Sequence, residues 1–126
     1  DPEFAEVARE NMALAGVTER VAVRAGDVTE ALDDLGAFDV VTLDTADAPA
    51  VVECGPDLLV AGGFLAVYSP FVEAAREVAE TAHEAGLEGV ETTETIRREM
   101  AFDDRGSRPT TAPVGHTGYL TFARAP

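Results

Sequence analysis

The feature that most constrains the fold is a nearly continuous apolar run at residues 38–43, which ends on Asp44. Unbroken apolarity over so short a stretch is typical of a strand that helices cover on both faces. A second buried strand is predicted at residues 64–68, directly after the glycine pair at 62–63. The first run is therefore predicted to be a parallel, central strand of an open sheet.

Apolar residues at helical spacing surround these runs. The first helix is predicted to begin after Asp1, which caps its free amides, and to stop at Gly16. A crossover helix is expected at about residues 50–60. An amphipathic helix is predicted over residues 71–82, and it stops at Gly86.

Two further segments complete the predicted architecture. A strand is expected at residues 21–25, shortly before Asp27. Residues 90–102 alternate loosely, and after a loop rich in Arg, Pro and Thr a last strand at 118–123 makes an antiparallel pair with them. The sequence therefore predicts an α/β fold over residues 1–126 as a single domain. Its sheet is Rossmann-like and mostly parallel, carries helices on both faces and ends in the antiparallel strand pair.

The charge balance bears on the class of partner. The chain has 24 acidic residues against 9 basic ones, all of them arginine, and its net charge is -15. An acidic, lysine-free composition is typical of haloarchaeal proteins adapted to molar salt; the alternative is an acidic partner-binding module. Negative charge normally disfavours nucleic acid, but in molar salt the Debye length falls to about 3 Å. The charge therefore does not exclude an RNA substrate.

The apolar runs and the cysteine content of the sequence exclude several classes of protein and site. No apolar run is long enough to cross a bilayer, and no charged-then-apolar leader opens the sequence. We therefore expect a cytoplasmic protein without a membrane partner. Cys54 stands alone, which excludes an internal disulfide and a Cys-based zinc cluster and favours a small buried thiol. No metal site is expected.

Asp27 and Asp44 each follow a predicted strand. Ligands of open α/β sheets bind beyond the carboxyl ends of the strands. A carboxylate placed there can accept hydrogen bonds from an adenine amino group, a ribose hydroxyl or an ammonium group. The alternative for each aspartate is that it caps the helix or turn that follows.

Several motifs occur in the order of one enzyme class. The weaker motifs reproduce the later half of the class I S-adenosylmethionine-dependent methyltransferase series: Ala25-Gly26-Asp27, Leu43-Asp44, Gly62-Gly63-Phe64-Leu65 and Tyr68-Ser69-Pro70. The strongest motif, preceded by Arg108-Pro109, is Gly115-His116-Thr117-Gly118-Tyr119-Leu120. It is similar to the terminal signature of the tRNA (adenine-N1)-methyltransferases. The chain therefore resembles the C-terminal part of the catalytic domain of that family.

The resemblance implies an activity and roles for particular residues. It implies an enzyme that uses S-adenosylmethionine and methylates N1 of a T-loop adenine of tRNA, at position 57 or 58. It also implies that Asp27, with the backbone of Val28 nearby, contacts the adenine of the cofactor. Asp44 would stand where cofactor and target adenine meet, as the catalytic residue. Positive charge spreads over the base as its N1 attacks the methyl group, and a nearby carboxylate stabilises that charge.

The terminal signature supplies predicted substrate-binding residues, His116 and Tyr119. Gly115 and Gly118 flank the histidine and favour a structural or substrate-positioning role for it. A general base is not needed, because adenine N1 carries a free lone pair.

A cluster of arginines precedes the signature. Four of the basic residues lie within twelve positions: Arg97, Arg98, Arg105 and Arg108. Guanidinium groups bind phosphate bidentately and stack on bases, so this patch is predicted to bind tRNA. The alternative, with equal weight, is pairing with neighbouring carboxylates.

The resemblance also implies that parts of the site lie outside this chain. In the family a glycine-rich loop and a ribose-binding acid precede the segment equivalent to Asp1, so we expect a fragment that lacks the first strands and is inactive alone. In the family, a proline-rich run that contains a Trp follows the position of Asp44. In this chain, residues 45–49 take its place and contain no Trp. The alternatives are a class I methyltransferase acting on a small molecule and a degenerate, non-catalytic interaction module of the same fold.

A homo-oligomer is expected from the topology of the family's sheet. The strands at 21–25 and 38–43 would both expose unpaired edges, which recruit partners. We expect the second to be covered either by the first, in a rearranged sheet, or by its own copy across a twofold axis.

Overall fold

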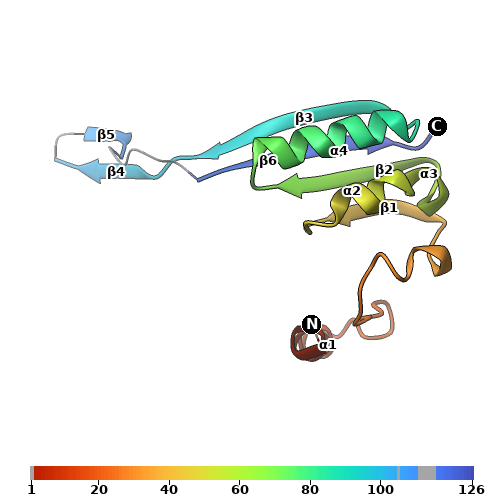
Figure 1. Ribbon diagram of the computed structural model, residues 1–126. Coiled ribbons are helices and arrows are strands. Elements are labelled where there is room, and N and C mark those ends of the chain that lie inside the picture. The colour runs from red at the N-terminus through yellow and green to blue at the C-terminus, as the bar shows by residue number, and fades with distance from the viewer. Residues whose placement is uncertain (1, 105, 111–115) are drawn as a thin grey trace. The chain divides into compact units, whose positions relative to one another are not determined.

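The computed structural model describes residues 2–104, 106–110 and 116–126 (Figure 1). The chain divides into two compact units, Asp1–Asp34 and Leu35–Pro126. The interpretation of residues 1–126 as one domain stays a prediction. Within the described ranges, no helix combines the length and the apolar composition that a bilayer span requires.

The first unit contains the predicted opening helix. Helix α1 spans Pro2–Leu14, and the chain leaves it at Gly16, whose φ of 71° suits a residue without a side chain. Ala5 is the buried residue of this helix, whereas Phe4 is 73% exposed. The apolar stripe of α1 is thus largely exposed. Asp1, the predicted cap, lies outside the described residues.

The prediction of a strand at residues 21–25 is wrong. The segment has no regular secondary structure, and a short 3-10 helix, η1 (Leu32–Asp34), follows it. A strand exists only through ladder hydrogen bonds to a neighbouring strand, and no described segment pairs with this one. Its carbonyl at Val23 instead accepts a hydrogen bond of 3.4 Å from Arg9 Nη2.

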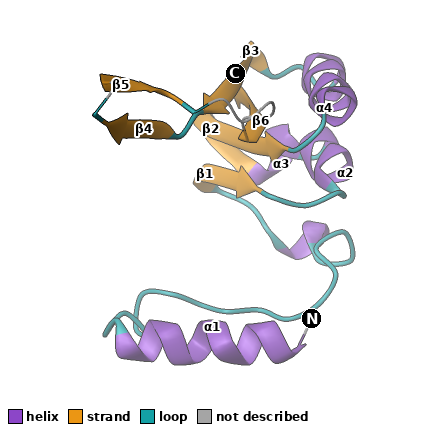
Figure 2. Cartoon of the chain, turned by 90° about the vertical axis from the view of Figure 1, so that its left-hand side faces the viewer, coloured by secondary structure: helices purple, strands orange, loops and turns teal. Residues whose placement is uncertain are grey.

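The second unit is built on a four-stranded mixed sheet (Figures 1 and 2). Its strands are β1 (Phe38–Leu43), β2 (Leu59–Ser69), β3 (Glu88–Arg97) and β6 (His116–Arg124), in the order β1-β2-β6-β3. Strands β1 and β2 are parallel, and β6 runs antiparallel to both β2 and β3. The α/β class and the terminal antiparallel pair are therefore confirmed.

Strand β1 lies at the edge of this sheet. Its parallel pairing is confirmed, but the prediction of a central strand is wrong, because among the described strands it pairs with β2 alone. Val40 is consequently 58% exposed and Phe38 37% exposed. The predicted pairing of β1 with residues 21–25 is also wrong. An apolar run shows that a strand tolerates burial; which strands flank it depends on segments far away in sequence.

Three helices accompany the sheet: α2 (Ala48–Glu53), α3 (Gly55–Leu58) and α4 (Val72–Glu84). In this unit α2 and α4 lie together on one face of the sheet (Figure 2). The predicted amphipathic helix is confirmed as α4. The crossover helix predicted at 50–60 is two shorter helices, because Pro56 has no N–H to donate to the preceding turn.

The core lies between the sheet and these helices. Alternate residues of β2 point into it, so Leu65 and Val67 are almost fully buried. Their partners come from α2, α4 and β6, and include Val52, Val78, Ala82 and Ala123. The even-numbered residues of β2 lie on the other face, where Phe64, Ala66 and Tyr68 are half-buried.

Strand β2 begins five residues before the predicted strand. Leu59 lies opposite Phe38, and the register then shifts before Val40 pairs with Phe64. Gly63 permits this irregularity: a Cβ there would lie 2.8 Å from the Val60 carbonyl oxygen. The glycine pair is thus part of the strand, not the turn before it.

The predicted loop between the last two strands contains a small hairpin. Strands β4 (Met100–Asp103) and β5 (Gly106–Pro109) pair antiparallel in a sheet of their own. Gly106 adopts φ 113°, which ordinary residues avoid, so it allows the tight reversal. The sequence signal was Asp-Asp-Arg-Gly at 103–106, a run of residues that favour turns.

Candidate functional site

A pocket of about 380 Å³ lies beyond the carboxyl ends of β1 and β2, beside α2 and α4. This is the end of an open α/β sheet at which ligands bind, and its volume suits a small organic group. The lining residues are Asp44, Thr45, Ala46, Ala48, Pro49, Tyr68, Ser69, Pro70, Phe71, Ala74, Glu77 and Val78.

Asp44 follows the last residue of β1 and lines this pocket. Its side chain is exposed, and no described residue donates a hydrogen bond to its carboxylate. The turn after it is held by its neighbours: Asp47 N donates to Thr45 Oγ1 at 3.2 Å, and Thr45 Oγ1 donates to Asp47 Oδ2 at 3.3 Å. The capping alternative therefore does not describe Asp44. Its carboxylate is free to accept hydrogen bonds from a ligand.

Glu77 adds a second carboxylate to the pocket from the first half of α4. The sequence interpretation missed it, because on α4 it looks like any exposed residue of an amphipathic helix. Among the described residues that line the pocket, two are acidic and none is basic. Such a lining favours groups that donate hydrogen bonds or carry positive charge, including an exocyclic amino group and an ammonium.

Tyr68 also lines the pocket, at the end of β2, and was likewise missed as a site residue. It is the penultimate residue of β2, which ends at Ser69. Its ring packs over Gly118 of β6, with which it makes close contact. The signal available in the sequence was an aromatic residue at the carboxyl end of a predicted parallel strand.

Asp27 belongs to the first unit and fulfils the capping alternative. Its Oδ1 accepts hydrogen bonds from Thr29 N at 2.9 Å and from Thr29 Oγ1 at 2.7 Å. The Thr29 hydroxyl, and secondarily its N–H, lower the pKa of the Asp27 carboxyl from its ordinary value. Val28 is half-buried, and its carbonyl accepts from Ala31 N at 3.1 Å. Asp27 and Asp44 thus lie in different units.

The described arginines of the predicted patch differ in their surroundings. Arg108 donates to both oxygens of Asp103, at 2.8 and 2.6 Å, as the intramolecular alternative requires. This hydrogen bonding raises the pKa of Arg108 further above its ordinary value. Arg97 and Arg98 have exposed side chains and make no ion pair within the described ranges. Arg105 lies outside the described residues.

Residues 116–120 of the terminal signature form the first half of β6. Strand β6 pairs with β2, whose last two residues line the pocket. Tyr119 is half-buried and lies opposite Ser69, a pocket residue. Thr117 Oγ1 donates to Glu94 Oε1 across to β3 at 2.7 Å. The backbone of His116 pairs with Arg97, whereas its side chain lies outside the described part of the structure.

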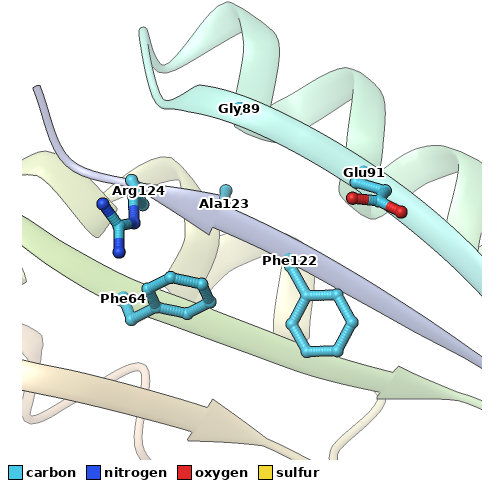
Figure 3. A pocket seen from close by; sticks show the side chains of 6 residues that line it. All are labelled: Phe64, Gly89, Glu91, Phe122, Ala123 and Arg124. Carbon is cyan, nitrogen blue, oxygen red and sulfur yellow. The ribbon is translucent and has the colours of Figure 1, made fainter.

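A second hollow, of about 320 Å³, lies over β2, β6 and β3 (Figure 3). Phe64 and Phe122 meet edge to face with ring centroids 6.4 Å apart, and the Arg124 guanidinium lies 4.8 Å from the centroid of Phe64. Glu91 and Gly89 complete its rim. Aromatic packing and the cation–π contact account for this arrangement. It holds none of the predicted site residues.

Comparison with solved structures assigns the fold to a class. The chain is similar to an S-adenosylmethionine-dependent O-methyltransferase from Thermotoga maritima, with TM-score 0.82 and 27% identity over 98% of this chain and 46% of that one. It is also similar to the tRNA (m1A58) methyltransferase TrmI from Aquifex aeolicus, with TM-score 0.77 and 20% identity over 98% of this chain and 50% of that one. The chain has a partial sheet of the class I S-adenosylmethionine-dependent methyltransferase fold.

A curated relative narrows the class. Over 99% of its length the chain is 32% identical to the tRNA (adenine(57)-N(1)/adenine(58)-N(1))-methyltransferase TrmI of Methanocaldococcus jannaschii, of which the match covers 53%. The predicted resemblance to the tRNA (adenine-N1)-methyltransferases is thus confirmed. It spans about half the length of these relatives. No protein-family model matches the chain.

Proposed function

We propose that the protein containing this chain transfers a methyl group from S-adenosylmethionine to N1 of a T-loop adenine, at position 57 or 58 of tRNA, in the cytoplasm. The observation that carries the proposal is the carboxylate of Asp44, which accepts no hydrogen bond from any described residue and lies in a pocket that Tyr68 also lines. The activity printed for the M. jannaschii relative supports the same substrate. Because the chain spans about half the length of these relatives, the reaction is proposed for the complete enzyme.

The chemistry asks little of the protein beyond placement and charge. Adenine N1 attacks through its own lone pair, so no side chain has to remove a proton first. As the bond forms, the base becomes cationic, and its amino group becomes a stronger hydrogen-bond donor. The Asp44 carboxylate accepts that hydrogen bond and stabilises the charge as it develops. The flat face of Tyr68 restricts the base to one plane, which favours in-line attack.

The donor set also fits the proposed cofactor, which supplies the methyl group as a sulfonium. Asp44 and Glu77 line the pocket with negative charge, which suits a cationic sulfonium and the ammonium of an amino-acid moiety. We propose that Asp27 and the Val28 backbone bind the cofactor's adenine. Asp27 would then either give up its hydrogen bonds with Thr29 for one from the adenine amino group, or keep them on Oδ1 and accept the new hydrogen bond with Oδ2.

For tRNA we propose that the exposed arginines Arg97 and Arg98 bind phosphates, assisted by Arg105. Arg108 would have to leave Asp103 before it could contribute. His116 and Tyr119 are proposed to position the RNA beside the pocket.

The first prediction is that Asp44→Asn in the complete enzyme lowers the methylation rate far more than it lowers binding. The single-turnover rate should fall about 100-fold, because the lost charge matters most when the base is cationic. Equilibrium dissociation constants for S-adenosylmethionine and tRNA should change by only a few fold. Asp57→Asn, at an exposed position on α3, is the matched control for loss of one negative charge. Equal losses in rate and cofactor affinity would make Asp44 a cofactor ligand instead.

A second candidate is methylation of a small molecule. The structurally similar T. maritima protein is an O-methyltransferase, so its methyl acceptor is an oxygen and not the N1 of an adenine. Assaying the complete enzyme on total tRNA from a strain that lacks the enzyme, then locating the methylated base by primer extension, separates the two. Activity on small catechols or other hydroxylated compounds without any on tRNA would favour the small-molecule substrate.

A further inference from the structure

Gly118 of β6 lies directly beneath the ring of Tyr68. A Cβ at position 118 would lie 2.5 Å from Tyr68 Cε2, 3.1 Å from its Oη and 3.2 Å from its Cζ. Leu120, two residues further along β6, is the ladder partner of Tyr68. The tyrosine therefore leans diagonally across β6 and fills the space that a side chain at 118 would occupy.

The backbone gives no separate reason for a glycine at this position. Several glycines in the described ranges adopt positive φ, and Gly118 is not among them. An alanine could therefore take the same backbone conformation. What excludes a side chain at Gly118 is the end of the Tyr68 side chain, since the three atoms nearest to an added Cβ all belong to it.

The position of this ring matters because Tyr68 and Asp44 line the same pocket. Strand β2 lies between β6 and β1, so a ring that is kept from lying over β6 moves toward β1. Asp44 follows β1 on that side. We propose that Gly118 is a positioning residue: by letting Tyr68 lie over β6, it keeps the space beside Asp44 open for a flat base. This inference rests on the proposed function, because it takes that space to receive the target adenine.

The contact also predicts how the protein tolerates a change. The atoms nearest to Gly118 are at the far end of a flexible side chain, so Tyr68 can turn aside when a methyl group is added. Gly118→Ala should therefore fold, with a far-UV circular dichroism spectrum like that of the wild type. The displaced ring should obstruct entry of the base.

The second prediction is a coupled effect of two substitutions in the complete enzyme. Gly118→Ala should lower kcat/KM for tRNA about 10- to 100-fold, mainly through KM, with little change in cofactor affinity. In the Tyr68→Leu background the same change should have an effect within about twofold, because leucine has no atoms where the added methyl group would be. In the Tyr68→Phe background the full loss should return, because the ring atoms Cε2 and Cζ remain.

Equal losses from Gly118→Ala in all three backgrounds would overturn the inference and leave Gly118 with a merely structural role. The proposed function fails in a different way, namely if the unmodified enzyme does not methylate tRNA. In that event the role of Gly118 can still be tested by NMR spectroscopy of the 126-residue chain. Its Gly118 Hα resonances should lie upfield because of the Tyr68 ring, and Gly118→Ala should shift the Tyr68 ring signals. Unmoved Tyr68 signals would contradict the inference whatever the substrate is.

Discussion

At the scale of single residues, two aspartates with the same predicted position have different surroundings. The Asp27 carboxylate accepts hydrogen bonds from Thr29 and so stabilises the turn that follows it. The turn after Asp44 is stabilised instead by hydrogen bonds between Thr45 and Asp47. A carboxylate with no partner among the described residues can accept a hydrogen bond from a ligand without losing one of theirs. Asp44 is therefore the better candidate for chemistry.

The third prediction concerns Asp27 and pH. Thr29→Val removes the hydroxyl that contributes most to the lowered pKa of Asp27, so that pKa should rise toward its ordinary value. Because the folded pKa is depressed, this interaction stabilises the fold above the unfolded pKa of about 3.9, and the stability is lost as pH falls through the folded pKa. Titration of the Asp27 carboxyl carbon by NMR measures the shift. Thr29→Ser keeps the hydroxyl and should keep the low pKa; an unchanged pKa in the valine variant would refute this explanation.

At the scale of elements, β1 combines an open edge with apolar side chains. It has one strand neighbour among the described segments, and Val40 is more than half exposed. Its row of free N–H and C=O groups can pair with another strand, and it carries no lysine or proline to prevent this. Residues 21–25 form no strand, so the cover that we predict for β1 is a second copy of β1 across a twofold axis.

The fourth prediction follows from this edge. Light scattering of the 126-residue chain in molar potassium chloride should give a dimer, with slow amide exchange along Val40 to Leu43. Val40→Lys should yield a monomer, because a charged edge residue opposes its own copy across the axis. Ala50→Lys, at an exposed position on α2, adds the same charge elsewhere and should leave the dimer intact. A wild-type monomer with fast exchange at β1 would exclude the twofold pairing.

At the scale of the whole molecule, negative charge dominates. Fifteen net negative charges repel one another across 126 residues. Surface ion pairs such as Arg76–Glu80, 2.7 Å apart, offset little of this, because both side chains are more than half exposed. Salt that screens the repulsion should favour the folded state.

The fifth prediction is a salt dependence of thermal stability. The Tm of the chain should rise steeply between low and molar potassium chloride, because the Debye length shortens from about 30 Å at 0.01 M to about 3 Å at 1 M. Thermal melts followed by circular dichroism measure this, and a sucrose series of equal osmolarity controls for water activity. A flat profile would remove the interpretation of a salt-adapted protein, and with it the reason that so acidic a chain binds RNA.

The sequence by itself determined what depends on neighbours in the chain. Helical spacing of apolar residues predicted α1 and α4, and the apolar runs predicted β1 and most of β2, because periodicity reflects the geometry of the element itself. The terminal signature and the order of the short motifs around Asp27 and Asp44 were enough to indicate the methyltransferase class.

The tertiary structure decided what depends on distant segments. The 21–25 segment has strand-like residues but no strand to pair with, and β1 is apolar enough for the middle of a sheet yet lies at its edge. The packing of Tyr68 on Gly118, and the entry of Glu77 into the pocket beside Asp44, each join residues that are far apart in sequence. Local pattern reports which conformation a segment prefers, whereas pairing and pocket walls depend on which distant segments fold against it.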